Sequence, residues 1–125
     1  MKQNKNIKNE AEIVYDRKYD ILIFKQKGKI YKKSIEFQNF VFDFDTEGSI
    51  MGVRIFDASK TFDVEQDVLA NIRAYYFKAQ VEKNIISIQL RFTNKEKKLQ
   101  ERISQQIMTE APYVLTDSSI ECVAG

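Results

Sequence analysis

The sequence predicts an α+β fold that is mainly β: an antiparallel meander of hairpins with one short helix after the fifth strand. Short runs rich in β-branched and aromatic residues alternate with turn residues along most of the chain. Several runs place apolar residues at every second position, which is the period of a strand with one buried face. Because 43% of the 125 residues are hydrophobic, the chain can close one hydrophobic core.

Five strand-like runs occupy the first half of the chain, at residues 12–16, 20–25, 29–37, 39–45 and 49–57. In the fourth run Phe40, Phe42 and Phe44 occupy alternate positions, which indicates an aromatic core face. Thr46-Glu47-Gly48 then predicts a hairpin, because glycine adopts the positive φ that a three-residue loop with a bulge requires. Residues 21–24 are all apolar, so both faces of that strand need cover.

The clearest helix signal lies near the middle of the chain. Asp63 stands where an N-cap residue would, with Gln66 three residues later. Val64, Val68 and Leu69 form one apolar stripe. Together these residues predict a single helix of about two turns.

A second hairpin is predicted in the other half of the chain. Residues 73–81 and 86–92 alternate apolar and polar side chains, and Lys83-Asn84 between them suits a two-residue turn. Residues 98–108 are ambiguous, because their apolar positions fit both a helix and a strand face, and the pattern alone favours a helix. Residues 113–123 are expected to form a last edge strand or a packed tail.

We expect a single domain at residues 12–125, preceded by a flexible leader at residues 1–11, which is rich in Lys and Asn and nearly free of apolar residues. Cys122 has no second cysteine for a disulfide or a metal site and no imidazole to activate it. The start of the chain lacks the pattern of a signal peptide, and no apolar run is long enough to span a bilayer. These features predict a cytoplasmic protein with no membrane partner.

Several short motifs follow one another in the first half of the chain. They are Tyr15-Asp16, Asp20-Ile21-Leu22-Ile23, Ser34-Ile35-Glu36, Asn39-Phe40-Val41-Phe42-Asp43-Phe44-Asp45, Gly48-Ser49-Ile50-Met51-Gly52-Val53-Arg54-Ile55 and Asp57-Ala58-Ser59. This succession resembles the small proteins of the domain-of-unknown-function 2283 family over roughly residues 13–60, with Arg54 where many members carry an acidic residue.

The resemblance is to the longer, archaeal-type members of that family. It implies a family-like core at residues 12–60, a helix-and-hairpin extension at residues 61–125, and a strand at residues 98–108. The family has no established activity, so the resemblance implies no catalytic residue. Some short members are encoded beside small toxin-like proteins, which implies that an antitoxin-like role is conceivable.

The chain contains no histidine, which excludes Ser-His-Asp and Cys-His nucleophile systems and His-rich catalytic zinc sites. Residues 43–48 are similar to the start of a calcium loop, but Arg54 occupies the closing position, which favours a plain hairpin turn. A metal-assisted hydrolase that uses Asp43, Asp45 and Asp57 is the least favoured alternative. We therefore expect no enzyme and assign no catalytic, cofactor-binding or metal-binding residue.

The leading hypothesis is a non-enzymatic protein-interaction module that self-associates as a homo-oligomer, because a strand that is apolar on both faces and the many sheet edges need cover. The residues expected to make contacts are Ile21, Ile23, Lys25, Lys32 and Lys33. The alternative is a nucleic-acid-binding or toxin-associated, antitoxin-like regulator, because a basic patch near Tyr31 is formed by Lys25, Lys27, Lys29, Lys32 and Lys33. A formal net charge of only +2 makes nucleic acid the less favoured partner.

Overall fold

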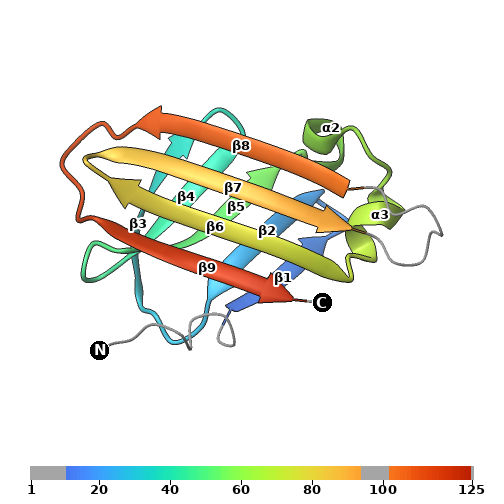
Figure 1. Cartoon of the computed structure of the whole chain (residues 1–125), viewed down its shortest axis with the longest axis horizontal. Coiled ribbons are helices and arrows are strands. Elements are labelled where there is room, and N and C mark those ends of the chain that lie inside the picture. The colour runs from blue at the N-terminus through green and yellow to red at the C-terminus, as the bar shows by residue number, and fades with distance from the viewer. Residues whose placement is uncertain (1–10, 94–101, 125) are drawn as a thin grey trace.

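The structure is a computed structural model that describes residues 11–93 and 102–124. The leader expected at residues 1–11 therefore lies outside the described residues except at its last position. Strands dominate the described chain and form two antiparallel sheets that lie one over the other and run in different directions (Figure 1). The mainly-β class is confirmed, but two packed sheets replace the single meander that the sequence predicts.

The first sheet has five strands in the order β1-β2-β5-β4-β3. They are β1 (Ala11–Asp16), β2 (Ile21–Gln26), β3 (Tyr31–Phe37), β4 (Phe40–Asp45) and β5 (Ile50–Phe56). A continuous meander would place β2 beside β3, whereas β2 pairs with β5. This pairing puts Leu22 opposite Ile55 and Phe24 opposite Val53, so that four fully buried side chains share the inner face.

The second sheet has four strands in the order β8-β7-β6-β9. They are β6 (Ala74–Glu82), β7 (Ile85–Thr93), β8 (Arg102–Glu110) and β9 (Ser118–Ala124). Three consecutive strands with a fourth that returns beside the first form a Greek key. The predicted second hairpin is confirmed as β6 and β7, and the predicted last edge strand is confirmed as β9, which pairs with β6.

Both predicted tight turns are confirmed. The backbone N–H of Asp45 donates to the carbonyl of Ser49 at 2.9 Å, which closes a three-residue loop, and Gly48 in that loop has a φ of 82°. Lys83 and Asn84 join β6 to β7 with φ values of 50° and 66°. Two consecutive positive φ values are typical of the turn whose twist matches that of the flanking strands.

The helix that the pattern alone favours at residues 98–108 is wrong. Arg102–Glu110 is strand β8, as the family resemblance implies, and it pairs with β7 along its whole length. Ile107 stands opposite Ile88, so tertiary pairing decides between two periods that the apolar residues fit equally well. Residues 98–101 of the ambiguous stretch lie outside the described residues.

Two five-residue helices, α2 (Ala58–Phe62) and α3 (Gln66–Ala70), replace the single helix predicted after the fifth strand. Asp63 is the C-cap of α2, with a φ of 56°, and so the prediction of Asp63 as an N-cap is wrong. Its left-handed backbone ends α2 before the chain continues to α3. Neither helix in the described part of the chain has the length and apolar character needed to cross a membrane.

The core fills the space between the two sheets. One cluster of buried apolar side chains includes residues from both sheets and from α2 and α3. The rings of Phe24 and Phe77 stack across this space with centroids 4.3 Å apart and planes 3° apart. At the end closed by the helices, the rings of Phe62 and Phe92 meet edge to face at 5.4 Å. The second sheet therefore covers the inner face of the first.

Candidate functional site

The outer face of the first sheet is the surface that the second sheet leaves free. We call it the open face, and its outward side chains include Val14, Ile21, Ile23, Lys25, Asp43 and Arg54. Val14 of β1 stands opposite Ile23 of β2, and Val14 is 45% exposed. The two helices lie at one end of the sandwich and do not cross this face (Figure 1). An apolar pair therefore remains uncovered by the described elements.

A hollow of about 440 Å³ lies on the open face beside this apolar pair. In the cross-strand register Gly52 stands between Lys25 and Asp43, so the central strand has no side chain there. A Cβ on Gly52 would lie 2.6 Å from the backbone oxygen of Phe24, because β2 and β5 approach closely at this point. The glycine both permits this close approach and opens the hollow.

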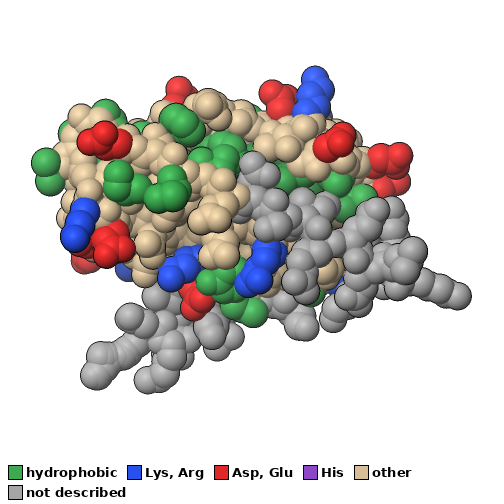
Figure 2. Space-filling model, turned by 45° about the horizontal axis from the view of Figure 1, so that its top comes forward, with side chains coloured by type: hydrophobic (Ala, Val, Ile, Leu, Met, Phe, Trp, Pro, Cys, Tyr) green, Lys and Arg blue, Asp and Glu red, His purple; other side chains and the backbone are tan. Residues whose placement is uncertain are grey.

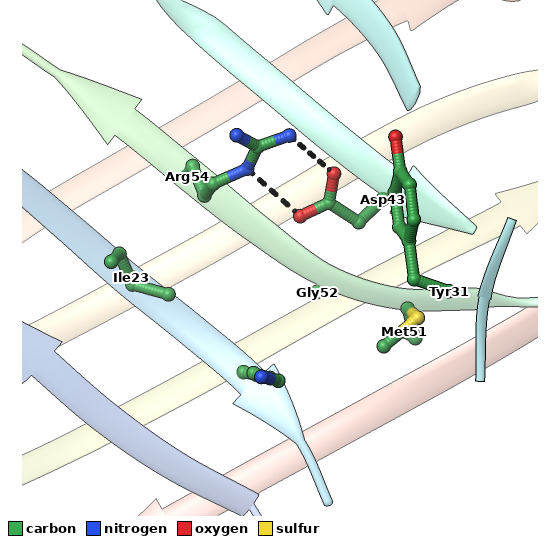
Figure 3. A pocket seen from close by; sticks show the side chains of 7 residues that line it. Ile23, Tyr31, Asp43, Met51, Gly52 and Arg54 are labelled. Carbon is green, nitrogen blue, oxygen red and sulfur yellow. Dashed lines mark hydrogen bonds and ion pairs between the residues drawn. The ribbon is translucent and has the colours of Figure 1, made fainter. Parts of the chain in front are cut away.

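A bulge and two neighbouring strands complete the walls of the hollow (Figure 3). The register between β4 and β5 shifts next to Asp43, and this shift leaves Met51 as the extra residue. Met51 is buried and lies along the edge of the hollow, across from Ile23. Tyr31 and Arg54 stand at different sides of the hollow, and Lys25 also lines it. The hollow thus has an apolar base with charged groups around it.

Arg54 and Asp43 form a two-pronged ion pair at the edge of the hollow (Figure 3). Arg54 donates from Nε to Oδ2 of Asp43 at 3.0 Å and from Nη2 to Oδ1 at 2.7 Å. The hydroxyl of Ser34 also donates to Asp43, at 2.7 Å, and is itself 2.6 Å from the hydroxyl of Tyr31. The hydrogen bond to Asp43 raises the pKa of Arg54. Both charges are therefore engaged with each other.

The structure places three of the five predicted contact residues together. Ile21, Ile23 and Lys25 occupy alternate positions of β2 and share the open face. Lys32 is exposed on the edge strand β3, at the bulge between Tyr31 and Lys33. The ammonium of Lys33 lies 4.4 Å from the ring centroid of Tyr113, in the segment between β8 and β9. Lys33 thus contacts a part of the chain that the sequence did not associate with it.

The aspartates suggested for a hydrolase do not converge. Asp45 accepts backbone hydrogen bonds from Glu47 and Ser49, both at 2.9 Å, and so closes the turn after β4. Asp57 follows β5 at the opposite end of the hairpin, beyond the pairing of Phe40 with Ile55. Within the described residues, no group of three or more Asp, Glu, Cys or His side chains is arranged to hold a metal ion.

Asp20 joins the first hairpin to α2. Its carboxylate accepts hydrogen bonds from the Tyr15 hydroxyl at 2.6 Å and from the Ser59 hydroxyl at 2.7 Å. The backbone N–H of Ser59 donates to the same carboxylate at 3.0 Å. Burial alone would raise the pKa of Asp20, but these hydrogen bonds outweigh burial and lower it. The side chain of Asp16 accepts from the backbone N–H of Tyr19 at 3.1 Å and so fixes the turn after β1.

Cys122 offers no nucleophile in this structure. It lies on the inner face of β9, opposite Phe77, and is buried. Burial raises the pKa of its thiol to about 11, so the reactive thiolate is scarce at neutral pH.

The comparisons with known proteins agree with the succession of motifs in the first sheet. The profile of the family described as protein of unknown function (DUF2283) matches residues 12–59. A protein of Methanosarcina mazei named putative hypoxanthine phosphoribosyltransferase is 33% identical over 68% of this chain and 70% of its own length. An uncharacterized protein of Methanocaldococcus jannaschii is 29% identical over 66% of this chain and 72% of its own length. No solved structure matches the chain. The chain belongs to the DUF2283 family of proteins of unknown function.

Proposed function

We propose that this protein is a non-enzymatic interaction module that self-associates through the open face of its first sheet. The observation that carries the proposal is the apolar pair of Val14 and Ile23, which stand opposite each other on adjacent strands of that face. Ile21 extends the apolar surface along β2. Burying one such side chain against a partner is worth about 1.5–3 kcal/mol, which favours association over exposure.

A second copy of the chain is the partner that the charges of the open face suit. The face carries both signs: Lys25 and Arg54 are positive, whereas Glu36 and Asp43 are negative. In a two-fold dimer the same patch meets itself, so a patch of mixed charge brings no net repulsion between the two copies. A strongly acidic or strongly basic partner would meet charges of its own sign on this face.

The outer face of the second sheet is less suited to this role. Its central outward side chains are polar and include Lys78, Gln80, Ser87 and Gln89. Figure 2, which looks obliquely onto this side of the molecule, shows hydrophobic side chains in small groups separated by polar and charged ones. The apolar contact expected at the centre of an interface is therefore favoured on the open face.

The site residues support a binding role over catalysis. Asp43 and Arg54 are held by each other, Asp45 is held by its turn, and Cys122 is buried. A general acid or base needs a group that can exchange a proton with a substrate. The name of the Methanosarcina mazei relative suggests phosphoribosyl transfer, but both described helices have five residues and follow no glycine-rich loop that could hold phosphates. We therefore do not propose that activity for this chain.

Substitution of Val14 by glutamate tests the proposal. A two-fold interface contains Val14 twice, so its replacement should raise the dissociation constant of the dimer by at least about 100-fold. Val123 gives a matched control, because it is a 43% exposed valine on the outward side of the other sheet's edge strand β9. In sedimentation velocity we expect a dimer for the wild type and for Val123→Glu, and a monomer for Val14→Glu.

Circular dichroism must first show that both variants retain the β-sheet spectrum of the wild type. A wild-type protein that sediments as a monomer at about 100 μM would contradict the proposal, because an interface of ordinary size binds at micromolar concentration or below. A dimer that survives Val14→Glu and dissociates with Val123→Glu would assign self-association to the second sheet.

A further inference from the structure

We propose that the hollow at Gly52 is a ligand site for a planar heterocycle that carries an anionic group, of the size and chemistry of a nucleoside monophosphate. The inference goes beyond self-association; because the hollow lies on the same face as the proposed interface and shares Ile23 with it, ligand binding is tested on the wild type and on the Val14→Glu variant. It stands on three features of the hollow: its shape, the charge left available at its edge, and the exposed ring beside it.

The shape comes from backbone features that a side-chain rearrangement would not abolish. The hollow of about 440 Å³ exists because Gly52 contributes no side chain and because the bulge displaces Met51. Clefts that hold small ligands commonly measure about 300–1,000 Å³. Ile23 provides an apolar surface for a ring beside the buried Met51, and the interstrand contacts of Gly52 hold the base of the hollow in place.

The charge available to a ligand is that of Lys25. Arg54 and Asp43 neutralise each other through the two-pronged ion pair. The side chain of Lys25 lines the hollow and makes no hydrogen bond or ion pair with any other described residue, because Glu12, which stands opposite it, pairs with Lys27 at 3.7 Å. The charged lining groups are thus two cations and one anion, so an anionic ligand balances them. A divalent cation would find a single carboxylate that already has its partner.

The ring beside the hollow is that of Tyr31, which is 54% exposed. Its hydroxyl lies 2.6 Å from the hydroxyl of Ser34, and this hydroxyl donates to Asp43, so the phenol is tied to the ion pair. Figure 3 shows Tyr31 standing at the side of the hollow and facing the space over Gly52. A heterocycle can lie against this ring and Ile23 while its edge meets the donor of Arg54 that the ion pair leaves unused, at Nη1.

Isothermal titration calorimetry with adenosine monophosphate, adenosine and inorganic phosphate separates these contributions. We expect adenosine monophosphate to bind one site per chain, and adenosine and phosphate to bind at least about tenfold more weakly each. Lys25→Gln should weaken the binding of adenosine monophosphate by at least about tenfold and leave the binding of adenosine unchanged. Tyr31→Leu should weaken the binding of both compounds, because each contains the heterocycle that would lie against the tyrosine ring.

Matched controls come from neighbouring residues that do not line the hollow. Lys27 follows Lys25 by two positions and pairs with Glu12 at 3.7 Å, and Tyr113 is a second exposed tyrosine. Lys27→Gln and Tyr113→Leu should bind adenosine monophosphate like the wild type. Equal losses for Lys25→Gln and Lys27→Gln would overturn the proposal, since they would indicate unspecific attraction of phosphate to surface lysines.

Two further outcomes decide the nature of the ligand. Absence of saturable binding of adenosine monophosphate, together with binding of a short single-stranded oligoadenylate, would assign this surface to a polymer and overturn the site. Absence of binding of either compound would also overturn it. The Val14→Glu variant keeps the two proposals distinguishable. A Val14→Glu monomer that binds adenosine monophosphate supports the site apart from the interface, whereas a folded monomer that no longer binds it would overturn a site contained in one chain.

Discussion

Phe24 and Phe77 are expected to couple the stability of the two sheets. Both rings are fully buried, one from β2 and one from β6, and they stack with centroids 4.3 Å apart and planes 3° apart. Replacing either ring by leucine keeps an apolar side chain but removes the stacked pair, and each single substitution should cost about 1–3 kcal/mol. A stacked pair is worth about 0.5–1.5 kcal/mol beyond its buried area. The double substitution should therefore cost less than the sum of the single ones by that amount.

The assay is a double-mutant cycle from urea unfolding followed by circular dichroism. Phe92 supplies the control pair with Phe24, because its ring contacts Phe62. The losses of unfolding free energy caused by leucine at Phe24 and at Phe92 should be additive to within about 0.5 kcal/mol. A coupling between Phe24 and Phe77 no larger than that of the control pair, or separate unfolding transitions for the two sheets, would refute the reasoning that one stacked contact joins them.

The remaining predictions concern a carboxylate and a glycine of the first sheet. Asp20→Asn should destabilise the protein by about 1–3 kcal/mol at pH 7, because its carboxylate accepts from both donors of Ser59. Since the folded-state pKa of Asp20 is lowered, its contribution is present above the ordinary value of 3.8 and is lost as the pH falls through the folded pKa. The wild-type and Asp20→Asn unfolding free energies should therefore converge only in acid, and a difference that is constant from pH 7 to acid would contradict this. Gly52→Ala should lower the thermal midpoint, because the new Cβ would lie 2.6 Å from the backbone oxygen of Phe24, and an unchanged midpoint would show that β2 and β5 can separate freely.

Local pattern was sufficient to predict most strands of this protein. The alternation of Phe40, Phe42 and Phe44 predicts β4, and the Lys83-Asn84 turn predicts the β6–β7 hairpin, because both depend on residues close together in the chain. The order of the strands depends on distant partners, such as Phe24 opposite Val53. No short window of sequence contains that information.

The helix after β5 was mispredicted for a related reason. Asp63 has the side chain of an N-cap residue, but it adopts a left-handed conformation at the end of α2. Aspartate is suited to both roles, so the residue type alone does not distinguish the beginning of one helix from the end of another. The buried Phe62 and Val68 decide the outcome, because two short helices allow both side chains to reach the core.

The candidate site was only partly predictable. The apolar residues at 21–24 indicated that β2 needs cover on both faces, and the structure places Leu22 and Phe24 inward and Ile21 and Ile23 outward. Val14 alternates with the acidic Glu12 and Asp16, and so its run gave no sign that this valine joins Ile23 on the open face. The hollow required knowledge that Gly52 lies between Lys25 and Asp43, which is a property of strand register.

The extent of the family match bears on what each face of the first sheet must do. Residues 12–59 include the five strands of that sheet except the first residue of β1 and end within α2, whereas the second sheet lies entirely outside the match. The matched strands carry fully buried side chains on the inner face, among them Leu22, Phe42 and Val53. A chain made of the matched segment alone would expose these side chains to water, at a cost of about 1.5–3 kcal/mol for each, and would need a second chain to bury them. In this protein the strands of the second sheet provide that cover within one chain. The inner face is therefore no longer available for association, and the open face, with its uncovered Val14 and Ile23, is the side of this sheet on which a partner can dock.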